Sequence, residues 1–235
     1  RGLGDVYKRQ GQHNANVARA MHRLGLEATQ AFEGGRERIA QFLGASRPEE
    51  VVALSNASEA LNLAANTLGT RLGPRDEVVI TIMEHHSNLV PWQLVCERTG
   101  AKLRWFDITD DGQLDLDKAE REGLINEHTK VVSLALASNV LGTINPVQRI
   151  AQWAHQVGAV VVVDASQAVP QMPVDVTELG VDLLAFTGHK MLGPTGIGIL
   201  WGRYDLLDDL PPFLGGGEMI EVVRMTGSTY AKPPH

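Results

Sequence analysis

The chain has 235 residues, of which 43% are hydrophobic and 21% charged, a composition typical of a globular domain with a substantial core. The formal net charge is −7, and the lysines and arginines are scattered, which argues against a nucleic-acid partner. No apolar run is long enough to span a bilayer, so we expect no membrane partner, and a single cysteine excludes an internal disulfide framework and agrees with a cytoplasmic setting.

Both ends of the sequence lead us to expect a piece of a longer protein. Residues 1–10 share no periodicity with the helical pattern that follows, and we expect a foreign or disordered leader there. The chain stops at 230–235 in an extended, proline-containing segment without a closing helix or strand. We therefore expect residues 11–235 to form one large but incomplete domain.

The first part of the chain predicts helices and strands in alternation. A helical pattern begins at Asn16 and stops at Gly44, and strands follow over 51–54 and 77–82. Ser58 is placed to cap the helix between these strands. It either only caps that helix, or its hydroxyl and the free N–H groups of the helix start hold a phosphate.

Two adjacent histidines, His85 and His86, come after the strand over 77–82. Neighbours on a strand point to opposite faces, and no third histidine or cysteine lies at ligand spacing, so we predict no metal site. Only one of the pair can face the edge of the sheet. There it either stacks on a flat ring and exchanges protons, or is a structural, hydrogen-bonded histidine. The helix over 90–99 follows, and Cys96 within it is expected to be a small buried hydrophobe.

Further strands are predicted over 102–106 and 131–137, with an acidic surface helix near Asp115 between them. Asn139 follows the second of these strands. It either forms a turn, or its amide binds a phenolic oxygen or a substrate carboxylate. A helix that starts at Pro146 leads to the next strand.

Four consecutive valines over 160–163 predict a strand that is buried on both faces and ends at Asp164. A second apolar run over 183–186 leads to Lys190, and the small residues over 193–198 indicate that backbone approaches another group closely. Strands that alternate with helices predict a doubly wound α/β fold with a mostly parallel sheet and helices on both faces. Ligands bind at the carboxyl edge of such sheets.

Lys190 and Asp164 together suggest a cofactor. Each alone has an ordinary explanation, because the carboxylate can cap a helix and the lysine can be a surface charge. Pyridoxal phosphate requires a lysine for its aldehyde and a carboxylate for its pyridinium nitrogen. No Gly-x-Gly-x-x-Gly sequence follows the first strand, so a dinucleotide has no visible site.

Four segments, over 84–92, 138–143, 164–168 and 188–196, resemble the cysteine desulfurases that serve iron–sulfur cluster assembly, within the class V aminotransferase superfamily. The resemblance runs from residue 14 to 233 and is nearest to the Suf-type and selenocysteine-lyase branch. It implies the large domain of a fold-type I pyridoxal-phosphate enzyme over 11–235, with the small C-terminal domain absent.

The resemblance also implies a role for each residue around the cofactor ring. Lys190 would hold pyridoxal 5′-phosphate covalently and take the substrate's α-proton. Asp164 would pair with the pyridine nitrogen, Gln167 and Asn139 would approach the phenolic oxygen, and His85 would stack over the ring. Lys190 and His85 are thus the expected catalytic residues.

The phosphate would lie against Ala57, Ser58, Thr187 and His189 by the same resemblance. Relatives commonly carry two threonines where this chain has Ala57 and Ser58, so Ala57 offers only its N–H group. Thr187 stands where a serine is usual and keeps the hydroxyl.

The implied reaction removes sulfur from L-cysteine, gives L-alanine, and leaves a persulfide on an enzyme cysteine for a sulfur-acceptor protein. Homodimers are implied by the family, and no residue distinguishes L-cysteine from L-selenocysteine. The family's nucleophilic cysteine and its arginine for the substrate carboxylate lie beyond His235, and Cys96 does not match that cysteine. We therefore expect the chain alone to be inactive or nearly so.

Two alternatives remain open from the sequence. The same fold and cofactor serve aminotransferases, epimerases and kynureninase-like lyases. A chain of this kind could also be a non-catalytic α/β module that binds a partner, in which case Lys190 would hold no cofactor.

Overall fold

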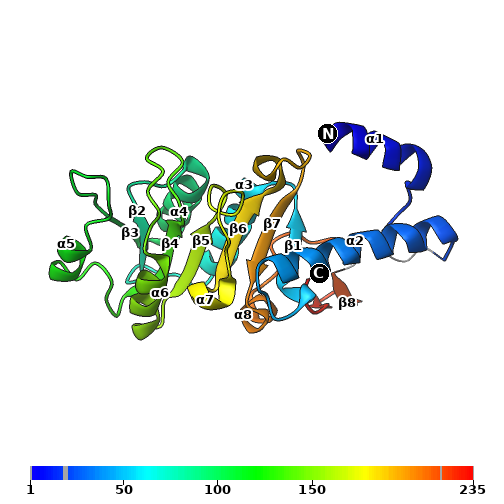
Figure 1. Ribbon diagram of the computed structural model, residues 1–235. Helices are drawn as coiled ribbons and strands as arrows, with labels where there is room; N and C mark the ends of the chain where they lie inside the picture. The colour runs from blue at the N-terminus through cyan, green and yellow to red at the C-terminus, as the bar shows by residue number, and fades with distance from the viewer. Residues whose placement is uncertain (1, 18–20, 218, 235) are drawn as a thin grey trace.

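A mixed seven-stranded sheet forms the centre of the molecule, in a computed structural model that describes residues 2–17, 21–217 and 219–234 (Figure 1). The strand order is β1-β7-β6-β5-β4-β2-β3. Neighbours from β3 to β6 are parallel, and β7 is antiparallel to both β6 and β1. The mostly parallel α/β sheet expected from the sequence is confirmed. The strands are β1 (Val51–Leu54), β2 (Glu77–Thr81), β3 (Lys102–Phe106), β4 (Thr129–Ala135), β5 (Val160–Asp164), β6 (Leu183–Thr187) and β7 (Gly198–Gly202).

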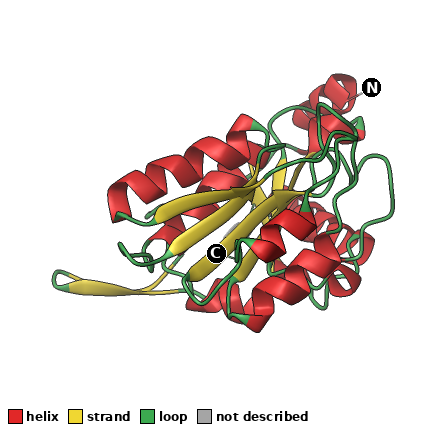
Figure 2. Cartoon of the chain, turned by 90° about the vertical axis from the view of Figure 1, so that its left-hand side faces the viewer, coloured by secondary structure: helices red, strands yellow, loops and turns green. Residues whose placement is uncertain are grey.

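Helices cover both faces of this sheet, as Figure 2 shows. Each face has its own apolar cluster, built from alternate residues of the strands and from the helices above them. One face carries α2 (Arg23–Phe42), α5 (Leu116–Arg121), α6 (Val147–Gln156) and α7 (Val176–Leu179). The opposite face carries α3 (Ala57–Gly69), α4 (His86–Thr99) and α8 (Tyr204–Asp209).

Strand β5 explains why four valines stand in a row. Val161 and Val163 pack into the cluster beneath α6, whereas Val160 and Val162 pack into the cluster beneath α3 and α4. Val161, Val162 and Val163 are fully buried. Because each buried valine contributes roughly 1.5–3 kcal/mol, the central strand anchors both layers and fixes where Asp164 emerges.

The first long helix begins later than the sequence predicts. Residues 14–17 are not helical, Ala18 lies outside the described residues, and α2 starts at Arg23. His22 is its cap, because the imidazole accepts the N–H of Gly25 at 3.1 Å. The expected stop is confirmed: Gly44 has a left-handed φ of 67°, and a Cβ there would overlap the carboxylate of Asp175.

Two terminal segments lie apart from the sheet. Helix α1 (Gly2–His13) lies above the N-terminal half of α2 in Figure 1 and is joined to it by a contact of 3.1 Å between His13 and Glu27. That residues 1–10 are foreign to the fold stays a prediction. Strands β8 (Ile220–Arg224) and β9 (Gly227–Tyr230) form a hairpin that extends away from the main sheet (Figure 2). In the described part of the chain, no helix is both long and apolar enough to cross a membrane.

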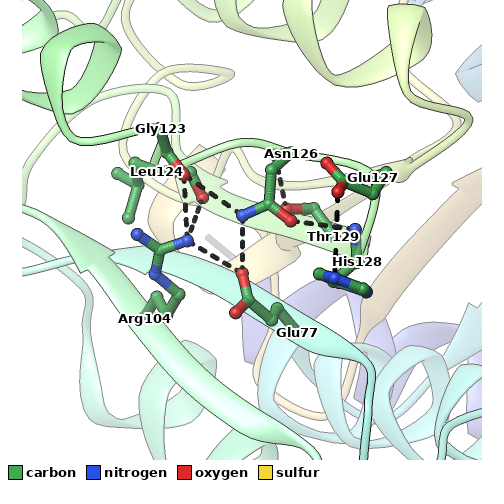
Figure 3. Close-up of polar contacts among 8 residues, drawn as sticks. All are labelled: Glu77, Arg104, Gly123, Leu124, Asn126, Glu127, His128 and Thr129. Atoms are coloured by element: carbon green, nitrogen blue, oxygen red, sulfur yellow. Dashed lines mark hydrogen bonds and ion pairs between the residues drawn. The ribbon is translucent and has the colours of Figure 1, made fainter.

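The carboxylate of Glu77, at the amino end of β2, joins that strand to the middle of β3 and to the segment before β4 (Figure 3). Glu77 accepts hydrogen bonds from Arg104 at 2.8 Å and from the side chain of Asn126 at 2.9 Å, and Arg104 also donates to the carbonyl of Gly123. Burial alone would raise the pKa of Glu77, but the bonds from Arg104 and Asn126 hold that pKa below its usual value. This clamp lies at the opposite end of β2 from the carboxyl edge of the sheet.

Candidate active site

Asp164 emerges in the middle of the carboxyl edge. It pairs with Ala135 of β4 on one side and with Ala185 of β6 on the other, and it is 6% exposed. Its Oδ1 accepts the N–H of Ser166 at 2.9 Å, whereas no described residue donates to Oδ2. A buried carboxylate with one free oxygen can bind a protonated ring nitrogen strongly.

The end of β6 and the start of α3 meet at Gly198. Gly198 pairs with Thr187 of β6 and with Leu54 of β1. A Cβ at this position would lie 2.2 Å from the carbonyl carbon of Asn56, so only glycine permits the contact. This confirms the close backbone approach expected from the small residues over 193–198.

The predicted cap of α3 was wrong. Asn56, not Ser58, is the cap: its backbone is extended and its side chain accepts the N–H of Glu59 at 2.8 Å. Glu59 in turn accepts the N–H of Ser55 at 2.6 Å. Asn56 reaches the third helical residue because it precedes the helix, whereas Ser58 already lies in the first turn. The exposed hydroxyl of Ser58 has no partner among the described residues.

The start of α3 and the end of β6 form a corner where hydrogen-bond donors gather. Neither the N–H of Ala57 nor that of Ser58 has a partner among the described residues, as expected for a helix start. The hydroxyl of Thr187, which is buried, lies 2.9 Å from Nδ1 of the exposed His189. These four residues come from two segments that Gly198 brings together.

His85 is the cap of α4, which begins at His86 rather than near residue 90. The strand alternation used to argue that only one histidine can face the edge does not apply, because β2 ends at Thr81 and a turn follows it. Nδ1 of His85 accepts the N–H of Ser87 at 3.1 Å, so the neutral ring carries its proton on Nε2. The ring is exposed and tilted by 43° to that of His86. His85 thus presents a free nitrogen at the edge.

Asn139 and Gln167 lie in the turns after β4 and β5. Asn139 is exposed and Gln167 half-buried. The hydroxyl of Ser138 holds the first turn by accepting the N–H of Leu141 at 3.1 Å. The structure places both amides at the carboxyl edge but joins neither to another described side chain.

Lys190 belongs to a short 3-10 helix, η2 (Gly188–Met191), directly after β6. Its half-buried side chain lines a cavity of about 640 Å³ formed with the end of α2 and the segment 169–175. Asp164 and His85 do not line this cavity. Lys190 thus follows β6, the strand that pairs with β5 and Asp164. The described structure shows no contact between the Lys190 amine and the Asp164 carboxylate.

Sequence reasoning missed Glu84, whose carboxyl lies directly before His85 and is hydrogen-bonded to Thr81, Asn88 and Ala135. Burial raises the pKa of Glu84 to about 7. In the sequence, the only feature that pointed to Glu84 was its position just after a buried strand. Cys96 behaves as predicted: it packs in the apolar cluster beneath α4, and burial raises its pKa to about 11. No three histidine, cysteine, aspartate or glutamate side chains converge as a metal site in the ranges that the structure describes.

The donor set at this edge fits pyridoxal phosphate. The glycine at 198 leaves room for α3 to approach, so N–H groups and a hydroxyl gather where a phosphate would bind. The free oxygen of Asp164 can take the ring nitrogen, and Lys190 follows the adjacent strand.

Comparisons with known proteins agree with this assignment. The family model "Aminotransferase class-V" matches residues 5–235. A probable cysteine desulfurase of Streptomyces coelicolor is 58% identical over 99% of this chain and 56% of its own length. The apo structure of a cysteine desulfurase from Thermococcus onnurineus superposes with a TM-score of 0.91 at 40% identity, over 99% of this chain and 57% of that chain.

The cysteine desulfurase CsdA of Escherichia coli superposes with a TM-score of 0.89 at 35% identity, over 99% of this chain and 58% of that chain. The chain thus spans about half the length of the proteins that it matches. The fold is that of the large domain of fold-type I enzymes. The chain belongs to the class-V aminotransferase family, whose members depend on pyridoxal phosphate.

Proposed function

We propose that this chain is the cofactor-binding part of a cysteine desulfurase, which takes sulfur from L-cysteine and releases L-alanine. The observation that carries the proposal is the free Oδ2 of buried Asp164, on the strand beside the one that leads to Lys190. The choice of cysteine as substrate is supported by the names of the relatives at 58% and 40% identity.

Pyridoxal phosphate, when bound, supplies a sink for the electrons released as a bond to the substrate's α-carbon breaks. Asp164 would hold a proton on the ring nitrogen through Oδ2, and its burial strengthens that attraction. Lys190 would hold the cofactor and receive the α-proton. Asn139 and Gln167 would face the phenolic oxygen from the turns after β4 and β5.

The remaining contacts would orient the ring and its phosphate. His85 would cover one face of the ring, with Nδ1 held by Ser87 and Nε2 free. The phosphate would lie at the start of α3, against the N–H groups of Ala57 and Ser58, with Thr187 and His189 on its other side.

The sulfur-accepting thiolate would lie outside these 235 residues. It would attack the substrate sulfur so that an S–S bond forms and the C–S bond breaks, its electron pair staying on the carbon that becomes alanine's methyl group. Cys96 is unsuited to this role because its thiol is buried and its raised pKa of about 11 keeps it protonated near neutral pH.

The cellular setting forms part of the same proposal. Sulfur would pass to an acceptor protein for iron–sulfur cluster assembly, and the enzyme would act as a cytoplasmic homodimer of the Suf-type branch. The unpaired state of Cys96 agrees with a reducing compartment. L-Selenocysteine would be an alternative substrate, because it differs from L-cysteine by one atom.

The experiment is a titration of the chain with pyridoxal phosphate, followed by visible absorbance. Binding should saturate, and Lys190→Ala should abolish the absorbance of the lysine-linked cofactor. L-Cysteine should then change the spectrum of the loaded chain more than D-cysteine does. A spectrum that responds equally to both enantiomers would argue against a site built for L-cysteine.

A further inference from the structure

Strands β2 and β4 separate before β4 ends. Their register runs from Glu77 opposite Thr129 to Val79 opposite Val132, whereas β4 continues to Ala135. The last residues of β4 are therefore without a strand partner on the β2 side. Buried backbone groups in such a gap must find other partners.

Two side chains take the place of the missing strand at Ala135. Its N–H donates to Oε1 of Glu84 at 3.0 Å, and its carbonyl accepts from the amide of Asn145 at 2.8 Å. On its other side, Ala135 is paired with Asp164, and the N–H of Leu136 donates to the Asp164 carbonyl at 2.9 Å. The backbone of Ala135 thus stands between Glu84 and Asp164.

Glu84 also holds the turn that carries His85. Its carboxylate accepts from the hydroxyl of Thr81 and from the amide of Asn88, each at 2.6 Å. Asn88 is fully buried, and its side-chain amide oxygen Oδ1 accepts from the hydroxyl of Ser133 at 2.7 Å. His85 therefore sits between two residues that are tied to the end of β2 and to β4.

Asn145 holds the turn that carries Asn139. It is 3% exposed, and its N–H donates to the carbonyl of Leu136 at 2.9 Å. Together with the amide bond to Ala135, this closes the loop over 138–145 onto the end of β4. Its Oδ1 is buried and has no partner in the described residues. A side chain that keeps an unpaired buried oxygen is held there by its other bonds.

We propose that Glu84 and Asn145 are positioning residues, which replace the missing strand partner of Ala135 and so fix the turns that present His85 and Asn139 beside Asp164. The benefit to cofactor binding rests on the proposed function, but the positioning of His85 does not. Asp164 is the charged group that faces Glu84 from β5, and the other contacts of the carboxylate, from Thr81, Asn88 and Ala135, are neutral.

The test compares Glu84→Gln with Glu77→Gln in the same chain. Both glutamates accept several hydrogen bonds, but Glu84 is half-buried in the turn after β2, whereas Glu77 begins β2 and serves the clamp in Figure 3 at the far edge. In Glu84→Gln the new NH₂ group faces a donor, so one of the three bonds is lost. Both variants should lower Tm.

The deciding readout is the ring resonances of His85 by NMR without cofactor, assigned by their absence in His85→Gln. Glu84→Gln should shift or broaden them, and Glu77→Gln should leave them in place. Pyridoxal phosphate affinity should fall about tenfold in Glu84→Gln only, which corresponds to one hydrogen bond of about 1.4 kcal/mol.

Unmoved His85 resonances in a destabilised Glu84→Gln chain would overturn the proposal and leave Glu84 a purely structural residue. If Glu84→Gln does not fold, Asn145→Ala decides instead, with the ring of His85 expected in place and the backbone resonance of Asn139 expected to shift. Failure of the wild-type chain to bind pyridoxal phosphate would count against the proposed function alone, because the NMR comparison needs no cofactor.

Discussion

Gly198, the first residue of β7, lies directly against Asn56, the cap of α3. A Cβ at Gly198 would stand 2.2 Å from the carbonyl carbon of Asn56, closer than real Cβ atoms come to backbone. Gly198 also pairs with Thr187, so this contact sets the start of α3 beside the end of β6. The corner proposed for the phosphate therefore depends on a residue without a side chain.

Gly198→Ala should push α3 away from the sheet. We expect a loss of about 1–3 kcal/mol in the free energy of unfolding and a weaker affinity for pyridoxal phosphate. Gly34→Ala is the matched control, because no atom lies within 4 Å of its added Cβ in α2, and it should raise stability by about 1 kcal/mol. Urea unfolding measures the stability of the two variants, and titration with pyridoxal phosphate measures their affinity. Equal affinities for pyridoxal phosphate in the two variants would count against the phosphate corner.

Asn56→Ala and Ser58→Ala should separate capping from phosphate binding. Loss of the Asn56 cap should lower the free energy of unfolding by about 1 kcal/mol. Ser58→Ala should leave stability within about 0.5 kcal/mol, because the hydroxyl is exposed. The affinity for pyridoxal phosphate should fall in Ser58→Ala, and an unchanged affinity there would remove Ser58 from the site.

Glu84 should make stability depend on pH. Its pKa in the folded chain, about 7, lies above the ordinary value of 4.5, so its protonated form favours folding. That contribution is present below about pH 4.5 and is lost as the pH rises through about 7. The free energy of unfolding of Glu84→Gln, relative to the wild type, should therefore rise with pH by at most about 3 kcal/mol.

Urea unfolding of both chains at several pH values between about 4.5 and about 8 measures this difference. Asp164→Asn should reduce the slope, because the Asp164 charge contributes to the raised pKa. A difference between wild type and Glu84→Gln that stays constant over the range would show that Glu84 does not titrate there.

Cys96 should be nearly inert toward thiol reagents. Burial raises its pKa from 9.0 to about 11, which lowers the thiolate fraction near neutral pH roughly 100-fold. The rate of disulfide exchange with an aromatic disulfide, measured in the folded chain and in denaturant, should differ by at least that factor. A folded chain that reacts as fast as the denatured one would mean that Cys96 is accessible.

Much of the fold could be predicted because it depends on local patterns. The valines over 160–163 can be buried on both faces only in a central strand, and Gly44 ends α2 because only glycine readily adopts its left-handed conformation there. The carboxyl edge then follows from the order of strands and helices, and with it the placement of Asp164 and Asn139.

The sequence predictions were wrong at the starts of α3 and α4, where the identity of the capping residue decides where the helix begins. Asn56 and Ser58 are both good caps by composition, and only the backbone decides which one precedes the helix. His85 caps α4 through a ring nitrogen, a role that residue preferences do not suggest. Glu84 was missed because its hydrogen bond to Ala135 depends on β2 leaving β4 early, which is a property of the register and not of either strand's own sequence.

The central claim is that pyridoxal phosphate binds at the edge between Asp164 and Lys190. The most direct measurement is to incubate the folded chain with pyridoxal phosphate, reduce with borohydride, and locate the pyridoxyl group by peptide mass spectrometry. We expect modification at Lys190 in preference to exposed lysines such as Lys130. A chain that is folded by circular dichroism but carries no adduct on Lys190 would contradict the claim and favour a non-catalytic module.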